Sequence, residues 1–179
     1  MNTFKSKLSK FKDGIVGFAK LERILAALCI FMPLILILFD NGNMRISISN
    51  YAYMDNNQVY VFLLTMASLM FIFNGTINGK KWYNIILGIC LAVVALFPHV
   101  EYRILHFTFA GIFFLGSAIV ISYYTSKKQF WIACGIAVII VLSLVAHFWF
   151  HWFSLFVAEW IALGIISVHY ILESYKILD

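Results

Sequence analysis

Charged residues are scarce in this chain. Asp, Glu, Lys and Arg together make up 12% of its 179 residues, whereas hydrophobic residues make up 63%. Soluble domains usually contain about 25% charged residues, so the composition excludes an ordinary soluble domain. It indicates an integral membrane protein, for which we expect membrane lipids and no nucleic acid as partners.

Cysteine is also scarce, and no two cysteines are paired in sequence. Cys29, Cys90 and Cys134 lie far apart in separate apolar segments, and none belongs to a C-x-x-C pair. Paired spacing is typical of redox and zinc motifs. We therefore interpret the three cysteines as small side chains of the protein interior.

Polar loops are few, and the apolar runs between them predict an all-α fold, a polytopic membrane helical bundle. A helix needs about 20 residues to cross a hydrocarbon core of about 30 Å. Apolar runs bounded by charged or turn residues predict six transmembrane helices. The expected spans are about 22–39, 58–74, 82–98, 104–124, 129–149 and 153–173, within one transmembrane domain over 22–179.

No polar loop divides residues 129–173. As one helix this segment would measure about 67 Å at 1.5 Å per residue, which is twice the thickness of a bilayer core. The only polar side chains near its middle lie between His147 and His151. We therefore predict a turn there, with both histidines at a membrane surface.

Basic residues lie mostly on one expected side of the membrane. Eleven of them fall on the side of both termini, and only Arg45 and Arg103 fall on the other. Because Lys and Arg are enriched in cytoplasmic loops, we expect a multi-pass protein of the cytoplasmic membrane with both termini cytoplasmic. The eleven are Lys5, Lys7, Lys10, Lys12, Lys20, Arg23, Lys80, Lys81, Lys127, Lys128 and Lys176.

Residues 1–21 precede the first span and have the pattern of an amphipathic helix. Phe4, Leu8, Phe11, Ile15 and Phe18 follow one another at spacings of four and three, with lysines between them. Such a helix can lie on an anionic cytoplasmic membrane surface. A partner-binding helix is the alternative interpretation.

The ionisable side chains of the interior gather in the outer half of the membrane. Glu159 lies about six residues into the last span, where a carboxylate costs about 2.5–3.5 kcal/mol unless it faces the bundle interior. We expect Glu159 to point inward and to bind a group of the outer cluster. His106 begins one face of the fourth span, and that face could meet Glu159, either as a functional site or as a bond that fastens two helices.

His147 and His151 are four residues apart, the spacing that places two imidazoles on one helix face and that many zinc sites use. The adjacent glutamate of the metalloprotease motif is missing. Aromatic residues surround both histidines, so an interfacial aromatic belt is the second interpretation. Proton or headgroup binding is the third.

The predicted outer loop, MRISISNYAYMDNN at 44–57, alternates hydroxyl and tyrosine side chains with apolar ones. We expect a short strand-like or re-entrant cap over the mouth of the bundle. Arg45 could pair with Glu101 or Asp55, or bind a lipid phosphate as a planar fork.

Four short segments carry a resemblance. R-I-S-I-S-N-Y at 45–51, A-L-F-P at 95–98, H-F-T-F-A at 106–110 and A-E-W-I-A-L-G at 158–164 resemble a family of small bacterial six-helix membrane proteins of unknown function. Asn57 and Gln58 stand where that family has Arg-Asp. The residues that fit its pattern are Arg45, Ser47, Ser49, Tyr51, His106 and Glu159.

The loop is also similar to the alkaline ceramidase superfamily of membrane hydrolases. That resemblance implies a zinc site made from a Ser-x-x-x-His element, an acid and a later His-x-x-x-His. Here Ser49 offers the serine, and Tyr53 stands at the histidine position. Gln58 replaces the acid, with Asp55 nearby, and 147–151 supplies the second element.

Three functions follow from these observations. In the first, an outward-facing polar pocket binds a lipid headgroup or a small polar ligand, in a non-catalytic or transport-like role. Its expected ligand-binding residues are Arg45, Ser47, Ser49, Tyr51, His106 and Glu159.

In the second, the protein is a zinc-dependent hydrolase of a lipid amide or ester. His106, His147 and His151 would hold the metal, and Glu159 or Asp55 would be the base for a metal-bound water; Ser49 is the remaining catalytic candidate. In the third, it is a structural or partner-stabilising subunit, in a homo-oligomer or with another membrane protein. Small residues would then provide the helix contacts, namely Gly111, Gly116, Ser117 and Gly164.

Overall fold

The computed structural model describes residues 17–77, 81–127 and 129–178. This part of the chain contains seven helices and no strand. Six of the helices are α-helical, and η1 is a short 3-10 helix. They are α2 (Gly17–Phe39), η1 (Ile48–Tyr53), α3 (Asn57–Ile77), α4 (Tyr83–Leu96), α5 (Arg103–Tyr124), α6 (Phe130–Phe148) and α7 (Leu155–Ser174).

The helices agree with the all-α prediction and overlap each of the six predicted ranges. Five of them are long and apolar enough to cross a membrane, and α4 is shorter, with 14 residues. Residues 17–21, which the sequence assigned to the amphipathic helix, form the start of α2. Residues 1–16, which hold the rest of the predicted amphipathic helix, lie outside the described part.

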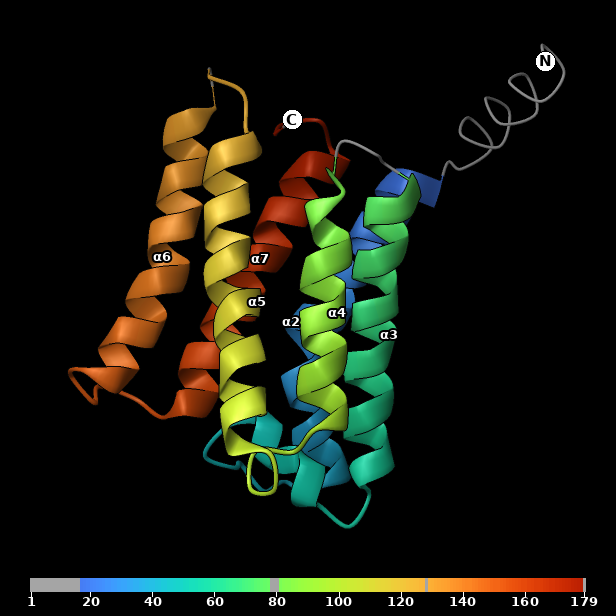
Figure 1. Ribbon diagram of the computed structural model, residues 1–179, viewed down its shortest axis with the longest axis vertical. Coiled ribbons are helices and arrows are strands. Elements are labelled where there is room, and N and C mark those ends of the chain that lie inside the picture. The colour runs from blue at the N-terminus through green and yellow to red at the C-terminus, as the bar shows by residue number, and fades with distance from the viewer. Residues whose placement is uncertain (1–16, 78–80, 128, 179) are drawn as a thin grey trace, which may run out of the picture.

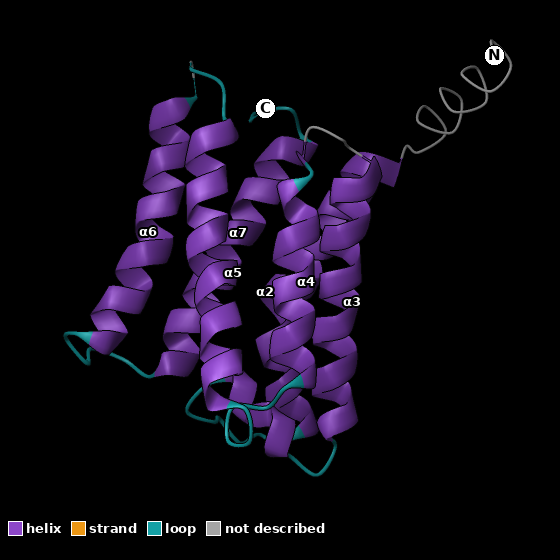
Figure 2. Cartoon of the chain, viewed as in Figure 1, coloured by secondary structure: helices purple, strands orange, loops and turns teal. Residues whose placement is uncertain are grey.

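The six α-helices run alternately up and down and form a closed ring (Figure 1). Each packs against its neighbours in sequence, and α7 closes the ring against α2. The helix α6 stands at one edge, where it contacts α5 and α7. We call the end of the bundle that holds η1 the η1 end, and the end where α2 begins and α7 finishes the C-terminal end. Loops cover both ends (Figure 2).

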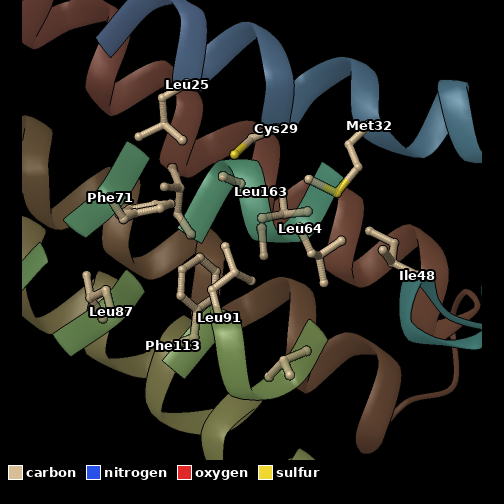
Figure 3. Packing of buried hydrophobic residues seen from close by; sticks show 14 of the residues in the cluster. Leu25, Cys29, Met32, Ile48, Leu64, Phe71, Leu87, Leu91, Phe113 and Leu163 are labelled. Carbon is tan, nitrogen blue, oxygen red and sulfur yellow. The ribbon is translucent and has the colours of Figure 1, made fainter. Parts of the chain in front are cut away.

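Apolar side chains fill the middle of the ring. Leu25, Cys29 and Met32 project from α2 toward the other helices (Figure 3), and all three are buried. Phe71 of α3 packs edge-to-face on Phe113 of α5, with ring centroids 5.5 Å apart. Close van der Waals packing of this kind drives helix association where lipid surrounds the helices.

Two glycines let α3 and α4 approach closely. A Cβ added at Gly88 would lie 2.7 Å from the Ser68 carbonyl oxygen, and one added at Gly75 would lie 2.9 Å from the Ile85 nitrogen. By contrast, Gly111, one of the glycines predicted to make helix contacts, has no atom within 4 Å of such a Cβ. A Cβ added at Gly116, another of the predicted contact glycines, would lie 3.1 Å from Leu87 Cδ2 of α4. Among the described glycines the closest helix contacts are therefore at Gly75 and Gly88, and Gly116 makes a looser one.

The turn predicted between His147 and His151 is confirmed. The helix α6 ends at Phe148 and α7 begins at Leu155. His151 has a positive φ of 52°, and the His147 Nδ1 donates to the Phe153 carbonyl at 2.8 Å. The chain thus reverses at the η1 end without any charged loop residue.

Candidate functional site

The loop between α2 and α3 folds across the η1 end. Of the two forms predicted for this cap, strand-like or re-entrant, the strand-like one is wrong, since residues 48–53 form the 3-10 helix η1. Ser47 caps η1, because its Oγ accepts a hydrogen bond from the Asn50 N–H at 3.2 Å. A local side-chain cap of this kind competes with extended structure, and it outweighs the alternating pattern. Ser49, in η1, is buried and its Oγ lies 3.0 Å from that of Ser47.

The first turns of α7 hold this loop in place. The Phe156 N–H donates to the Ile46 carbonyl at 2.8 Å. The Ile48 N–H donates to Glu159 Oε2 at 2.6 Å, so the predicted interior carboxylate does bind the outer loop, through its backbone.

Arg45 is already engaged within the loop. Its Nε and Nη2 donate to the two carboxylate oxygens of Asp40, at 2.7 and 3.0 Å. The prediction that Arg45 pairs with Glu101 or Asp55 is therefore wrong. Hydrogen bonds from the Arg45 guanidinium lower the pKa of Asp40 below its usual value. Arg45 thus ties the end of α2 to η1.

Tyr51 also serves to hold the loop together. It is fully buried, and its hydroxyl donates to the Asn43 carbonyl at 2.8 Å. Burial raises the pKa of Tyr51 above its usual value. Neither Arg45 nor Tyr51, both predicted to bind a ligand, lines any of the three hollows described next.

The first hollow is an internal cavity enclosed by α2, η1, α3, α4, α5 and α7. Its volume is about 40 Å³. On the same scale one water molecule needs about 10–15 Å³. Ser49, His106 and Glu159, all predicted to belong to one pocket, line it together with Tyr60 and Cys29. The structure therefore brings three of the six predicted ligand-binding residues into one cavity.

The second hollow, which we call the vestibule, lies at the outer surface of the η1 end. Its volume is about 450 Å³. Its walls include the polar side chains Ser47, Ser49, Asn50, His99 and Arg103. The vestibule is thus a mainly apolar hollow beside η1 and the first turn of α5, with several polar side chains among its walls.

The third hollow, which we call the lateral groove, runs between α5, α6 and α7. Its volume is about 290 Å³. Its walls are mainly apolar and include Gly111, Leu144 and Phe148. Glu159 lines both the lateral groove and the internal cavity. Phe107 and Leu155 line both the groove and the vestibule, so the three hollows adjoin one another.

A comparison with protein families decides the affiliation of the chain. Residues 31–174 match the family of unknown function DUF7103. The chain belongs to that family. No curated protein and no solved structure matches it. Membership of DUF7103 agrees with the uncharacterised family that the resemblance implied, and the comparisons lend no support to the likeness to ceramidases.

In this DUF7103 member the proposed zinc ligands are not assembled. Among the described residues, no three His, Cys, Asp or Glu side chains form a group that could hold a metal ion. The Nδ1 of His106 donates to the Phe97 carbonyl at 2.8 Å, whereas His147 donates within its own turn. The rings of His147 and His151 lie 6.3 Å apart. His106 and His147 are thus oriented by hydrogen bonds to neighbouring loops, which sequence spacing does not reveal.

The remaining catalytic candidate, Asp55, is exposed near the start of α3 and lines none of the three hollows. Ser49 and Glu159 line the internal cavity together, but Asp55 does not line it with them. The polar residues that sequence reasoning did not assign to a site are His99, Asn50 and Arg103 of the vestibule. Two of them could have been found from the sequence, since His99 and Arg103 lie on the predicted outer side.

Sequence reasoning also missed a cluster of polar side chains at the C-terminal end of the bundle. Lys81 Nζ lies 2.8 Å from Glu22 Oε1 and 2.7 Å from Glu173 Oε2. Asn84 donates to Asn74 Oδ1 at 2.7 Å and accepts a bond from the Tyr170 hydroxyl at 3.0 Å. Glu159 is therefore not the one interior carboxylate that the sequence suggested. We call this group the Lys81 cluster, and its members are Glu22, Asn74, Lys81, Asn84, Tyr170 and Glu173.

Proposed function

We propose that all six α-helices cross the cytoplasmic membrane, with the C-terminal end in the cytoplasm. At 1.5 Å per residue α4 measures about 21 Å, and its position between α3 and α5 requires it to return the chain to the η1 end (Figure 1). The bias of basic residues toward the C-terminal end supports this orientation. Trp149 and Trp152 are exposed at the η1 end, as expected for an interfacial aromatic belt.

We further propose that the protein binds a membrane lipid, in a non-catalytic or transport-like role. The observation that carries this proposal is the position of Glu159, whose side chain lines both the internal cavity and the lateral groove. Ionisable groups at membrane depth are costly and mark ligand pathways. A half-buried carboxylate between an inner chamber and a groove that opens sideways suits a ligand that enters from the bilayer.

The side chains that line the two adjoining hollows match an amphiphile. The vestibule offers hydroxyl, amide, imidazole and guanidinium groups, whereas the lateral groove is lined by Phe107, Phe114, Leu144 and Phe148. Ligand sites combine mainly apolar walls with a few placed polar groups. A headgroup in the vestibule with an acyl chain in the groove would occupy both hollows, because Phe107 and Leu155 are common to them.

Blocking the lateral groove tests this function. Gly111 lines the groove, and a Cβ there meets no atom within 4 Å, so Gly111→Phe can fill the groove without a backbone clash. The matched controls are Gly111→Ala and Gly135→Phe, the latter on the exposed face of α6. The readout is the number of lipids retained per chain in native mass spectrometry after treatment with a delipidating detergent.

We expect Gly111→Phe to lose the retained lipid and both controls to keep it. Retention of lipid at the wild-type level by a folded Gly111→Phe protein would overturn the proposal. Folding is verified independently by the elution volume and unfolding temperature of each variant.

A further inference from the structure

We propose that the vestibule selects the phosphate of an anionic glycerophospholipid, with Arg103 and His99 as the phosphate-binding side chains. This inference rests on the proposed lipid-binding function and names the class of lipid. It is carried by unpaired polar groups in one hollow, by the absence of acids from its described walls, and by the link to the lateral groove.

Arg103 supplies the positive charge of the vestibule. It is the first residue of α5, it is exposed, and it lines the vestibule. The ion pairs of the described residues include Arg45 with Asp40 but none that involves Arg103. A guanidinium presents a planar fork of donors that matches two phosphate oxygens. Of the two arginines at the η1 end, Arg103 is therefore the one available to a ligand.

His99 lies on the same wall and has an unsatisfied donor or acceptor. Its Nδ1 is buried and has no hydrogen-bond partner among the described residues. The ring is held in place by neighbouring aromatic rings, 5.4 Å from Tyr53 and 5.6 Å from His106 between centroids. Buried polar atoms without a partner are rare in folded proteins. The ring itself lines the vestibule, so a rotation of the side chain that turns this nitrogen toward the vestibule would give it a headgroup oxygen as its partner.

The backbone around Arg103 also favours an anion. The N-cap residue of α5, Tyr102, makes no capping hydrogen bond with its side chain, and the first turn of α5 contains no acidic residue. The positive end of the helix dipole and the unpaired N–H groups of a first turn attract phosphate. The nearby Glu101 accepts a hydrogen bond from the Tyr53 hydroxyl at 2.8 Å and does not line the vestibule.

The net charge of the headgroup follows from the same walls. The described lining of the vestibule contains one arginine and one histidine and no Asp or Glu. A choline or ethanolamine cation would therefore find no carboxylate partner there, whereas a headgroup of net negative charge would meet the Arg103 guanidinium. Phe107 and Leu155 continue from the vestibule into the lateral groove, which favours a phosphate attached to acyl chains over free phosphate.

The experiment measures lipid retention by native mass spectrometry after the purified, delipidated full chain is mixed with one lipid at a time. The lipids are phosphatidylglycerol, phosphatidylcholine and diacylglycerol with identical acyl chains, and an excess of inorganic phosphate is added in a separate arm. The variants are Arg103→Gln, Arg103→Lys and His99→Gln. Lys127→Gln, which removes an exposed charge from the other end, is the control.

We expect wild-type protein and Lys127→Gln to prefer phosphatidylglycerol over the other two lipids. In Arg103→Gln this preference should fall about tenfold, the loss expected for one charge-assisted hydrogen bond. The variant should still retain lipid, but without preference for a charged headgroup. Arg103→Lys should keep part of the preference, and His99→Gln should lower it less than Arg103→Gln.

Three results would overturn the inference. They are an equal retention of the three lipids by the wild type, an unchanged preference in a folded Arg103→Gln protein, and displacement of phosphatidylglycerol by inorganic phosphate, which would identify free phosphate as the ligand. None of these affects the Gly111→Phe result, so the failure of this inference remains distinguishable from the failure of the lipid-binding function.

Discussion

The two ends of the bundle bury polar groups in different ways. At the C-terminal end, Lys81 lies between Glu22 and Glu173, and the hollow beside the Lys81 cluster has a volume of only about 10 Å³. At the η1 end, Arg103 and His99 face a vestibule of about 450 Å³. Polar groups that satisfy one another fasten helices together, whereas the polar groups beside the vestibule are the ones that we propose to bind a ligand.

One atom of the C-terminal end departs from this rule. The Nδ1 of His169 is buried and has no hydrogen-bond partner among the described residues. His169 also lines the small hollow beside the cluster, whose size is that of one water molecule. A single water would satisfy this nitrogen, so the exception does not imply a second ligand site.

Removal of the Lys81 ammonium should have the largest effect on stability. Lys81→Met leaves the carboxylates of Glu22 and Glu173 buried without their cation. Breaking a buried ion pair from one side costs about 3–5 kcal/mol, so the free energy of unfolding should fall by about that amount. Denaturation of the protein in detergent micelles, followed by circular dichroism, measures the change.

A matched variant separates pairing from the loss of a positive charge. Lys127→Met removes an exposed lysine from the same end and should change the unfolding free energy little. The triple variant Glu22→Gln, Lys81→Met, Glu173→Gln should recover part of the lost stability. Equal stability of Lys81→Met and Lys127→Met would contradict the assignment of Lys81 to a fastening role.

The second prediction compares two glycines, one at each kind of site. Gly75 packs against backbone atoms beside Lys81, with 2.9 Å from an added Cβ to the Ile85 nitrogen and 3.0 Å to the Lys81 oxygen. Overpacking of this kind costs about 1–3 kcal/mol, so Gly75→Ala should lower the unfolding free energy by that much. Gly111→Ala, in the open groove, should leave it unchanged or slightly higher, since alanine favours a helix.

The same denaturation experiment measures both alanine variants side by side. A loss of stability in Gly111→Ala as large as that in Gly75→Ala would show that the groove is closed in the folded protein. It would thereby remove the contrast between a packed end and an open one.

Much of the fold could be predicted because hydrophobic runs determine where helices lie in a membrane protein. The ranges agreed with the helices to within a few residues at most ends. The length of the apolar segment required a turn, and its only polar side chains, at His147 to His151, gave its position. The form of the outer loop could not be predicted, since it depends on the Ser47 cap and on the chain reversal at Asn41 and Gly42, with φ of 57° and 84°. That reversal brings Asp40 to Arg45.

The site was predictable only in part. Ser49, His106 and Glu159 were predicted to lie together because all three fall on the predicted outer side and because a carboxylate in a span must face inward. The Lys81 cluster was not predicted, since Lys81 meets Glu22 and Glu173 across 59 and 92 residues of sequence. A charge within an apolar helix, as at Glu22, signals that a partner is needed but does not identify it.

The smallest expected effect concerns the pH dependence contributed by the η1 end. Because the Arg45 guanidinium lowers the pKa of Asp40 in the folded protein, the pair contributes its full stability above the unfolded-state pKa of about 4. That contribution is lost as the pH falls through the lower, folded pKa. Asp40→Asn should therefore show a shallower fall in unfolding temperature between neutral pH and about pH 3 than the wild type. Asp55→Asn, an exposed site in the same connection, should keep the wild-type slope. Equal slopes for wild type and Asp40→Asn would mean that this pair leaves the loop's stability unchanged, and that η1 is held by Glu159 and Tyr51 instead.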